Sequence, residues 1–334
     1  MTEPDSAFAS TAGLLGRIAG QLGAQLAHVR PYDRRQRKPD EEACPPMNVP
    51  ALAGQGRALF ATPAPAAPAP TLVAVGHGSR DPRARATLAR LLDRVRELRP
   101  GLDVRLAHIE LNAPLLDDTL AELAAEGRDV VLVPLLFAPG HHVTHDLPAA
   151  VAAATATAGA PALHARAADP RAADPFGASA FRARVADPLG AHPLLVEALA
   201  DRLAEAGWTP DDTAATGVVL ASAGSRDPRS GAVIRRIAVL LGERLGGVPV
   251  VPAYASAATP TVPAAVRALT ARGRHRVAVA SCFTAPGLFV TRAAADAPWI
   301  ASDPLGAHPA LARLVLHRYD RARTTLPVRE LAAV

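Results

Sequence analysis

Two motifs occur once in each half of this chain, and this duplication constrains the fold more than any other feature of the sequence. Residues 76–82 read GHGSRDP and residues 222–228 read SAGSRDP. Residues 139–144 read PGHHVT and residues 286–291 read PGLFVT. An internal repeat of this kind indicates two copies of one structural unit in tandem. We therefore predict two similar domains that face each other across a cleft.

A third motif, DPLGAHP, closes each copy at residues 187–193 and 303–309. It lies farther from PGHHVT in the first copy than from PGLFVT in the second, so the first copy carries additional residues. These residues coincide with the Ala- and Pro-rich stretch 149–181, which we expect to form a surface insertion.

Short apolar runs alternate with amphipathic helical patterns from residue 71 onward. In the first copy, the patterns predict strands over 71–77, 103–109 and 129–136 and helices over 83–98 and 114–126. Continuous apolar strands between amphipathic helices are typical of a parallel sheet that is covered on both faces. The predicted fold class is therefore α/β with parallel sheets, in which ligands bind at the carboxyl ends of the strands.

The chain length of 334 residues suggests about two domains of roughly 150 residues each. We expect a disordered or partly helical leader over 1–70, domains over 71–207 and 216–322, and a tail over 323–334. Met47 offers an alternative start, which the intact mass of the natural protein would test.

The lysine and cysteine content excludes several classes of chemistry. Lys38 is the only lysine and lies among Arg and Pro, without the context of a Walker A loop or of a pyridoxal Schiff base. Cys44 and Cys282 are too few for a four-cysteine zinc or iron–sulfur site within one chain, and they suggest a reducing compartment. A metal site would therefore use His and carboxylate side chains.

The net charge is +5, and almost all of the basic residues are arginines. The sequence has no basic run interleaved with aromatic residues, so it does not suggest a nucleic-acid partner. No apolar run has the length of roughly 18 residues that a membrane span needs, and the N-terminus does not have the pattern of a signal peptide. We expect a cytoplasmic protein that acts as a monomer or homodimer, without a membrane partner.

Comparison of the two copies separates scaffold from candidate chemistry. Asp81-Pro82 and Asp227-Pro228 occur in both copies, and Asp at the N-cap followed by Pro is a common helix start. His192 and His308 belong to the shared DPLGAHP motif and are expected to be structural. His77, Glu110 and His142 occur only in the first copy; the second copy has Ala223, Ser256 and Phe289 at these positions.

The three first-copy residues follow consecutive predicted strands, so their side chains should meet at one edge of the sheet. His77 is also compatible with a simple turn cap, and Glu110 with a solvated surface position. His142 lies in a loop with His141 and His145, and imidazole is a good ligand for divalent transition metals. The pattern favours a two-histidine, one-carboxylate metal site. His108 is expected to support this site or to belong to the core.

At these residues the sequence resembles the class II sirohydrochlorin chelatases, the CbiX-like group. The resemblance rests on GHGSRDP at 76–82, HIELNAP at 108–114 and VPLLFAPGHHVTHDLP at 133–148, and it extends over roughly residues 71–322. It implies two flavodoxin-like halves, of which the second is degenerate, with the tetrapyrrole in the cleft between them. It also implies insertion of Fe²⁺ or Co²⁺ into sirohydrochlorin, for sirohaem or cobalamin biosynthesis, without ATP and without a tightly bound cofactor.

The resemblance places His77, His142 and Glu110 at the metal. The two histidines are expected to ligate the ion and accept pyrrole protons, and Glu110 to position the ion and balance charge. Arginines on both sides of the cleft are expected to bind substrate carboxylates, although each is also compatible with an ordinary solvated helix end. These arginines are Arg80, Arg83, Arg226 and Arg229.

Three alternatives stay open at this point. The chain could act on another tetrapyrrole, or it could be a non-catalytic carrier of metal or tetrapyrrole. A hydrolase that uses Ser79 is disfavoured because no G-x-S-x-G elbow is present. The same His and Glu ligands bind both Fe²⁺ and Co²⁺, so the residues do not choose between the ions.

Overall fold

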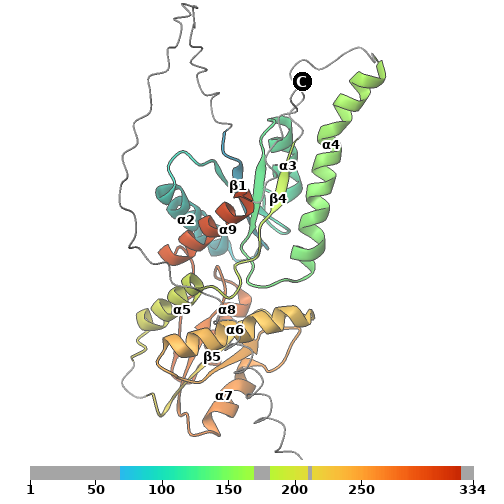
Figure 1. Cartoon of the computed structure of the whole chain (residues 1–334). Coiled ribbons are helices and arrows are strands. Elements are labelled where there is room, and N and C mark those ends of the chain that lie inside the picture. Colours follow the sequence, from blue (N-terminus) through green and yellow to red (C-terminus); the bar gives the residue numbers. More distant parts are fainter. Residues whose placement is uncertain (1–67, 169–180, 210–212, 325–334) are drawn as a thin grey trace, which may run out of the picture. The chain divides into compact units, whose positions relative to one another are not determined.

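The computed structural model of the chain describes residues 68–168, 181–209 and 213–324 (Figure 1). These residues contain two four-stranded parallel sheets with the strand orders β2-β1-β3-β4 and β6-β5-β7-β8. The first sheet consists of β1 (Thr71–Gly76), β2 (Val104–His108), β3 (Val130–Pro134) and β4 (Ala183–Val185). The second consists of β5 (Thr216–Ser222), β6 (Val250–Tyr254), β7 (Arg276–Ser281) and β8 (Ile300–Ala301). The shared strand order confirms the α/β class and the tandem duplication.

Helices cover both sheets. The first half contains α2 (Pro82–Leu98), α3 (Leu116–Ala125), the π-helical turn η2 (His142–Asp146), α4 (Leu147–Ala168) and α5 (Pro193–Glu205). The second half contains α6 (Pro228–Arg244), α7 (Val262–Thr270), α8 (Leu288–Ala295) and α9 (Pro309–Thr324). Helix α3 begins later than the sequence pattern predicts because the carbonyl of Pro114 accepts a hydrogen bond from the backbone of His108.

The central strands β1, β3, β5 and β7 are mostly apolar because both of their faces are buried. In β1, Leu72 and Ala74 belong to one hydrophobic cluster, whereas Val73 and Val75 point to the other face and belong to a second. Successive side chains of a strand point to opposite faces, so a strand between two helical layers has no polar face.

The last helix of each half packs against the other half. Helix α9 contacts α2 and β3, as Figure 1 shows for α2, and α5 contacts α6 and β7. Tyr319 of α9 is fully buried and donates a hydrogen bond to the carbonyl of Pro70 at 2.7 Å. Asp320 binds Arg99, the C-cap residue of α2, through both carboxylate oxygens. One hydrophobic cluster consequently contains side chains from both halves. The domains proposed at 71–207 and 216–322 therefore exchange their last helices.

The stretch proposed as an insertion is helical in its described part, because α4 runs to Ala168. Most of the leader, with Lys38, Cys44 and Met47, lies outside the described residues, as do 169–180 and the tail from 325. Among the described helices, none combines the length and the apolar character that crossing a bilayer requires.

Candidate active site

The loops after β1 and β2 are joined by backbone hydrogen bonds, and they carry His77 and Glu110. The Glu110 amide donates to the carbonyl of His77 at 3.0 Å, and the Ser79 amide donates to Oδ1 of Asn112 at 2.7 Å. Gly78 has φ 111°, and a Cβ at this position would lie 1.9 Å from the carbonyl oxygen of Glu110. Only glycine permits this approach, which places the two candidate side chains, His77 and Glu110, next to each other.

His77 and Glu110 form the first imidazole–carboxylate pair of the site. His77 Nδ1 lies 3.3 Å from Glu110 Oε1, and both side chains are about half exposed. An ionised carboxylate can only accept hydrogen bonds, so a hydrogen bond between these two groups requires the proton on Nδ1. The Nε2 atom of His77 then keeps its lone pair.

His142 forms a second pair with an aspartate. It opens η2 after β3, and its Nδ1 lies 2.6 Å from Asp146 Oδ2. The ring of His142 lies 4.7 Å from the ring of His77, centroid to centroid, in an edge-on arrangement. The structure therefore brings His77, Glu110 and His142 to one edge of the first sheet, as their spacing in the sequence predicts. Within the described part of the chain, however, no three His, Cys, Asp or Glu side chains form a group that could hold a metal.

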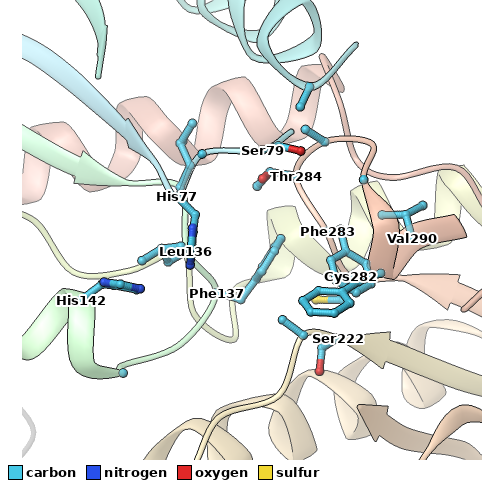
Figure 2. A pocket seen from close by; sticks show the side chains of 18 of the residues that line it. His77, Ser79, Leu136, Phe137, His142, Ser222, Cys282, Phe283, Thr284 and Val290 are labelled. Carbon is cyan, nitrogen blue, oxygen red and sulfur yellow. The ribbon is translucent and has the colours of Figure 1, made fainter. Parts of the chain in front are cut away.

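Both halves line a cavity of about 1130 Å³ into which the two histidines face. Figure 2 shows His77 and His142 on one side of this cavity and Phe283 and Val290 on the other, with Phe137 between them. The imidazole, carboxylate and guanidinium side chains of the lining come from the first half, and the second half contributes apolar side chains together with several serines, Thr284 and Cys282.

The second-half wall has lost the ionisable groups at the three corresponding positions. Ala223, Ser256 and Phe289 all line the cavity, and the Ser256 hydroxyl donates to the carbonyl of Ala223 at 3.0 Å. The repeated loop is nevertheless retained, because Gly224 has φ 93° and approaches the carbonyl of Ser256 as Gly78 approaches that of Glu110. Within the described residues, the duplicated scaffold therefore carries one set of candidate catalytic groups.

The four predicted substrate-binding arginines lie in three kinds of position. Arg80 lines the cavity, and Arg226 and Arg229 line an adjoining pocket of about 340 Å³. Arg83 is not part of either wall; it pairs with the N-cap Asp81 at 2.7 Å and is largely exposed.

Arg229 makes the equivalent pair with the N-cap Asp227 at 2.7 Å. In each half, hydrogen bonding to the arginine side chain lowers the pKa of the N-cap aspartate. Arg80 and Arg226 do not make such a pair among the described residues, so they are better placed than Arg83 and Arg229 to bind a substrate carboxylate.

The other histidines of the motifs have identifiable positions. His192 and His308 cap α5 and α9 by accepting hydrogen bonds from Leu194 and Ala310, each at 3.2 Å, which confirms a structural role. His108 is buried in the cavity wall, and burial lowers its pKa, so the ring is neutral at pH 7.

His141 and His145 stack on each other beside His142, with their ring centroids 4.7 Å apart. Both line the smaller pocket rather than contacting His77, and His141 lines the main cavity as well.

Cys282 lines the cavity but is not a thiolate. Burial raises the pKa of its thiol to about 12, so the sulfur keeps its proton at neutral pH. We expect iodoacetamide to leave Cys282 unmodified in the folded protein and to alkylate it in denaturant, as peptide mass spectrometry would show. Alkylation at equal rates in both conditions would contradict the buried position.

Sequence reasoning missed the roles of Asn112 and Asp146. Asn112 joins the two loops, and no spacing rule predicts that contact. Asp146 stands four residues after His142, a separation that places two side chains on one face of a helix. The i, i+4 spacing is the sequence signal for this contact, and the prediction of a loop around His142 is wrong because residues 142–146 are helical.

Comparison with known proteins identifies the family. The CbiX family matches residues 71–206 and 217–322, which together form most of the chain. The chain belongs to the CbiX family. The resemblance seen in its motifs is thereby confirmed, and the match in both halves agrees with the duplicated fold.

Curated relatives of this CbiX-family chain include sirohydrochlorin cobaltochelatases from Methanococcus aeolicus and Methanosarcina acetivorans. The first is 31% identical over 78 residues, which are 23% of this chain and 54% of the relative. The second is 30% identical over 78 residues, which are 23% of this chain and 60% of the relative. The chain thus spans about half the length of the curated relatives it matches.

Solved structures share the fold at low sequence identity. SirB from Bacillus subtilis with Fe³⁺ has a TM-score of 0.58 at 21% identity and covers 76% of this chain and 95% of its own. CbiX, described as the terminal enzyme of sirohaem biosynthesis in denitrifying bacteria, has a TM-score of 0.51 at 23% identity and covers 75% and 98%. These similarities establish the two-domain chelatase fold.

Proposed function

We propose that this CbiX-family chain is a chelatase that inserts a divalent metal ion, Fe²⁺ or Co²⁺, into sirohydrochlorin, in the biosynthesis of sirohaem or cobalamin. The observation that carries the proposal is the pair of facing imidazoles, His77 and His142, each with a carboxylate on Nδ1, at the wall of the cavity of about 1130 Å³. The single set of polar groups supports one active site per chain.

The shape and lining of the cavity suit a tetrapyrrole that has an apolar ring and a carboxylate rim. Phe137, Phe283 and Phe289 provide apolar wall area for the ring. Arg80 lies on the first-half wall and Arg226 in the adjoining pocket, where each guanidinium can pair with an acetate or propionate group. Arg83 and Arg229 would bind a substrate carboxylate only after breaking their ion pairs with Asp81 and Asp227.

Metal insertion requires that an ion lose its water, that two pyrrole nitrogens lose protons, and that metal–nitrogen bonds form. The Nε2 atoms of His77 and His142 are the available donors for the ion, and once the ion has left them for the macrocycle the same lone pairs are free to accept the two pyrrole protons. Glu110 holds His77 in place and offsets positive charge as the proton arrives. Two imidazole ligands are fewer than a structural metal site uses, which favours release of the ion to the macrocycle.

The reaction as proposed uses only these side chains and needs no nucleotide. The arrangement of the groups on one wall further implies that the ion approaches the macrocycle from the first-half side, while the apolar second-half wall covers the other face of the ring.

Anaerobic incubation of the protein with sirohydrochlorin and either Co²⁺ or Fe²⁺ tests the function, with the absorbance of the macrocycle as readout. We expect metallation faster than the protein-free control, and the two rates rank the ions. Binding of the macrocycle without acceleration would replace the chelatase with a carrier. Acceleration only with a different tetrapyrrole would keep the reaction and change the substrate.

A further inference from the structure

The geometry points to Asp146 as a positioning residue that orients the His142 imidazole so that its Nε2 atom is presented to the metal ion. This inference rests on the proposed function. It concerns a side chain that neither the family resemblance nor the comparisons assign.

The contact between Asp146 and His142 is the shortest imidazole–carboxylate contact of the site. Asp146 Oδ2 lies 2.6 Å from His142 Nδ1, whereas Glu110 lies 3.3 Å from His77. Because the carboxylate only accepts, His142 must donate from Nδ1, and its lone pair is then on Nε2. A carboxylate on the non-ligating nitrogen fixes the tautomer and ring orientation of a metal-binding histidine.

The second half of the chain provides an internal comparison for this pair. At the positions of His142 and Asp146, α8 has Phe289 and Ala293, so the imidazole and the carboxylate are lost together. The other pair behaves in the same way, because Ala223 and Ser256 replace His77 and Glu110. In each pair the carboxylate is present only where there is a histidine to orient.

Two other roles for Asp146 fit the structure less well. As a direct metal ligand it would have to leave the short contact with His142, and its second oxygen already lies 3.5 Å from Nε2 of His141. Asp146 also does not cap the start of α4, because α4 has no free start at this position. The Leu147 amide donates a hydrogen bond to the His142 carbonyl, so η2 continues directly into α4. Acting through His142 is the role that uses the 2.6 Å contact.

The experiment compares three variants with the wild-type protein. Asp146→Ala removes the acceptor, and the natural Ala293 shows that alanine fits the equivalent position of the fold. Asp146→Asn keeps a neutral oxygen that can still accept from Nδ1. Asp320→Ala is the matched control: it removes a carboxylate of similar exposure that pairs with Arg99, outside the cavity.

Two readouts are independent of catalytic turnover. The first is the dissociation constant of Co²⁺ from the substrate-free protein, measured by titration. The second is the tautomer of His142, read from long-range ¹H–¹⁵N correlation spectra at a pH where the ring is neutral. A metallation assay adds the KM for Co²⁺ and kcat.

We expect Asp146→Ala to weaken Co²⁺ binding by roughly 10- to 100-fold. Asp146→Asn should lose less Co²⁺ affinity than Asp146→Ala, and Asp320→Ala should bind Co²⁺ like the wild type. The KM for Co²⁺ should rise more than kcat falls. His142 should carry its proton on Nδ1 in the wild type and shift toward the Nε2–H form in Asp146→Ala.

Wild-type Co²⁺ affinity in Asp146→Ala, or an Nε2–H tautomer in the wild-type protein, would overturn the inference. If Asp146→Ala fails to fold, the tautomer of His142 in the wild-type protein decides, because that measurement needs no variant, and an Nε2–H form there overturns the inference. If the wild type binds Co²⁺ but does not metallate sirohydrochlorin, the proposed function fails while the affinity and tautomer still test Asp146.

Discussion

We expect replacement of His77 or His142 with alanine to lower kcat/KM for sirohydrochlorin metallation by roughly 10²- to 10⁴-fold, the range for loss of a positioned proton acceptor. Each variant removes one of the two Nε2 atoms that face the cavity, and with it a donor to the ion and an acceptor for a pyrrole proton. The two rings lie 4.7 Å apart, so we expect the double variant to be little worse than either single one, because groups that act as a unit are not additive.

The measurement is the anaerobic metallation rate with Co²⁺ and with Fe²⁺, after circular dichroism has shown that each variant is folded. His275→Ala serves as the control, because His275 is exposed before β7 and does not line the cavity. A variant of His77 or His142 that keeps wild-type rates would remove that residue from the proposed chemistry.

Gly78→Ala should damage both stability and activity. The new Cβ would lie 1.9 Å from the Glu110 carbonyl oxygen, at a φ of 111° that residues with a side chain rarely adopt. We expect a loss on the order of 3 kcal/mol in the free energy of unfolding. That loss corresponds to a fall in Tm of roughly 6–12 °C for a unit of this size. Since the clash separates the loops that hold His77 and Glu110, metallation by the folded fraction should fall by roughly 10²-fold.

Gly224→Ala is the matched control that the duplication supplies. Its Cβ would meet the Ser256 carbonyl oxygen at the same 1.9 Å, with φ 93°, so the loss of stability should be similar. The second-half loops carry no imidazole or carboxylate at the equivalent positions, so the folded protein should lose much less activity. Thermal unfolding and metallation rates of both variants check the pair. Equal losses of activity at equal folded fractions would mean that the first-half loops have no special role.

Much of this architecture is predictable from the order of residues along the chain. Apolar runs such as 71–77 and 129–136 are strands because both faces of a central parallel strand must be apolar, and the structure has β1 and β3 there. The repeated motifs predict two similar units, and both sheets have the same strand order. The convergence of His77, Glu110 and His142 follows from strand ends that meet at one sheet edge, which is a regular consequence of parallel topology.

The pairing of side chains is not predictable in the same way, because hydrogen-bond partners depend on loop geometry. The resemblance implies that Glu110 lies at the metal; in the structure its Oε1 lies 3.3 Å from His77 Nδ1, and its role as a direct ligand remains a prediction. Asp146 falls beside the histidines that the sequence pattern assigns to a loop, and a loop gives no reason to pair it with His142. It contacts His142 because η2 is helical, which brings residues four apart onto one face.

The local patterns of apolar, charged and turn-forming residues specify the strands, the helices and their capping residues, since each of these depends on neighbours within a few positions. The sequence also specifies that the first copy of the duplicated unit has His77 and His142, whereas the second copy has Ala223 and Phe289 at these positions. The exchange of α5 and α9 between the halves depends on packing between residues far apart in the sequence, such as Tyr319 with Pro70. That packing joins both sheets to one hydrophobic cluster and so gives the cavity two walls, one with His77 and His142 and one that is largely apolar.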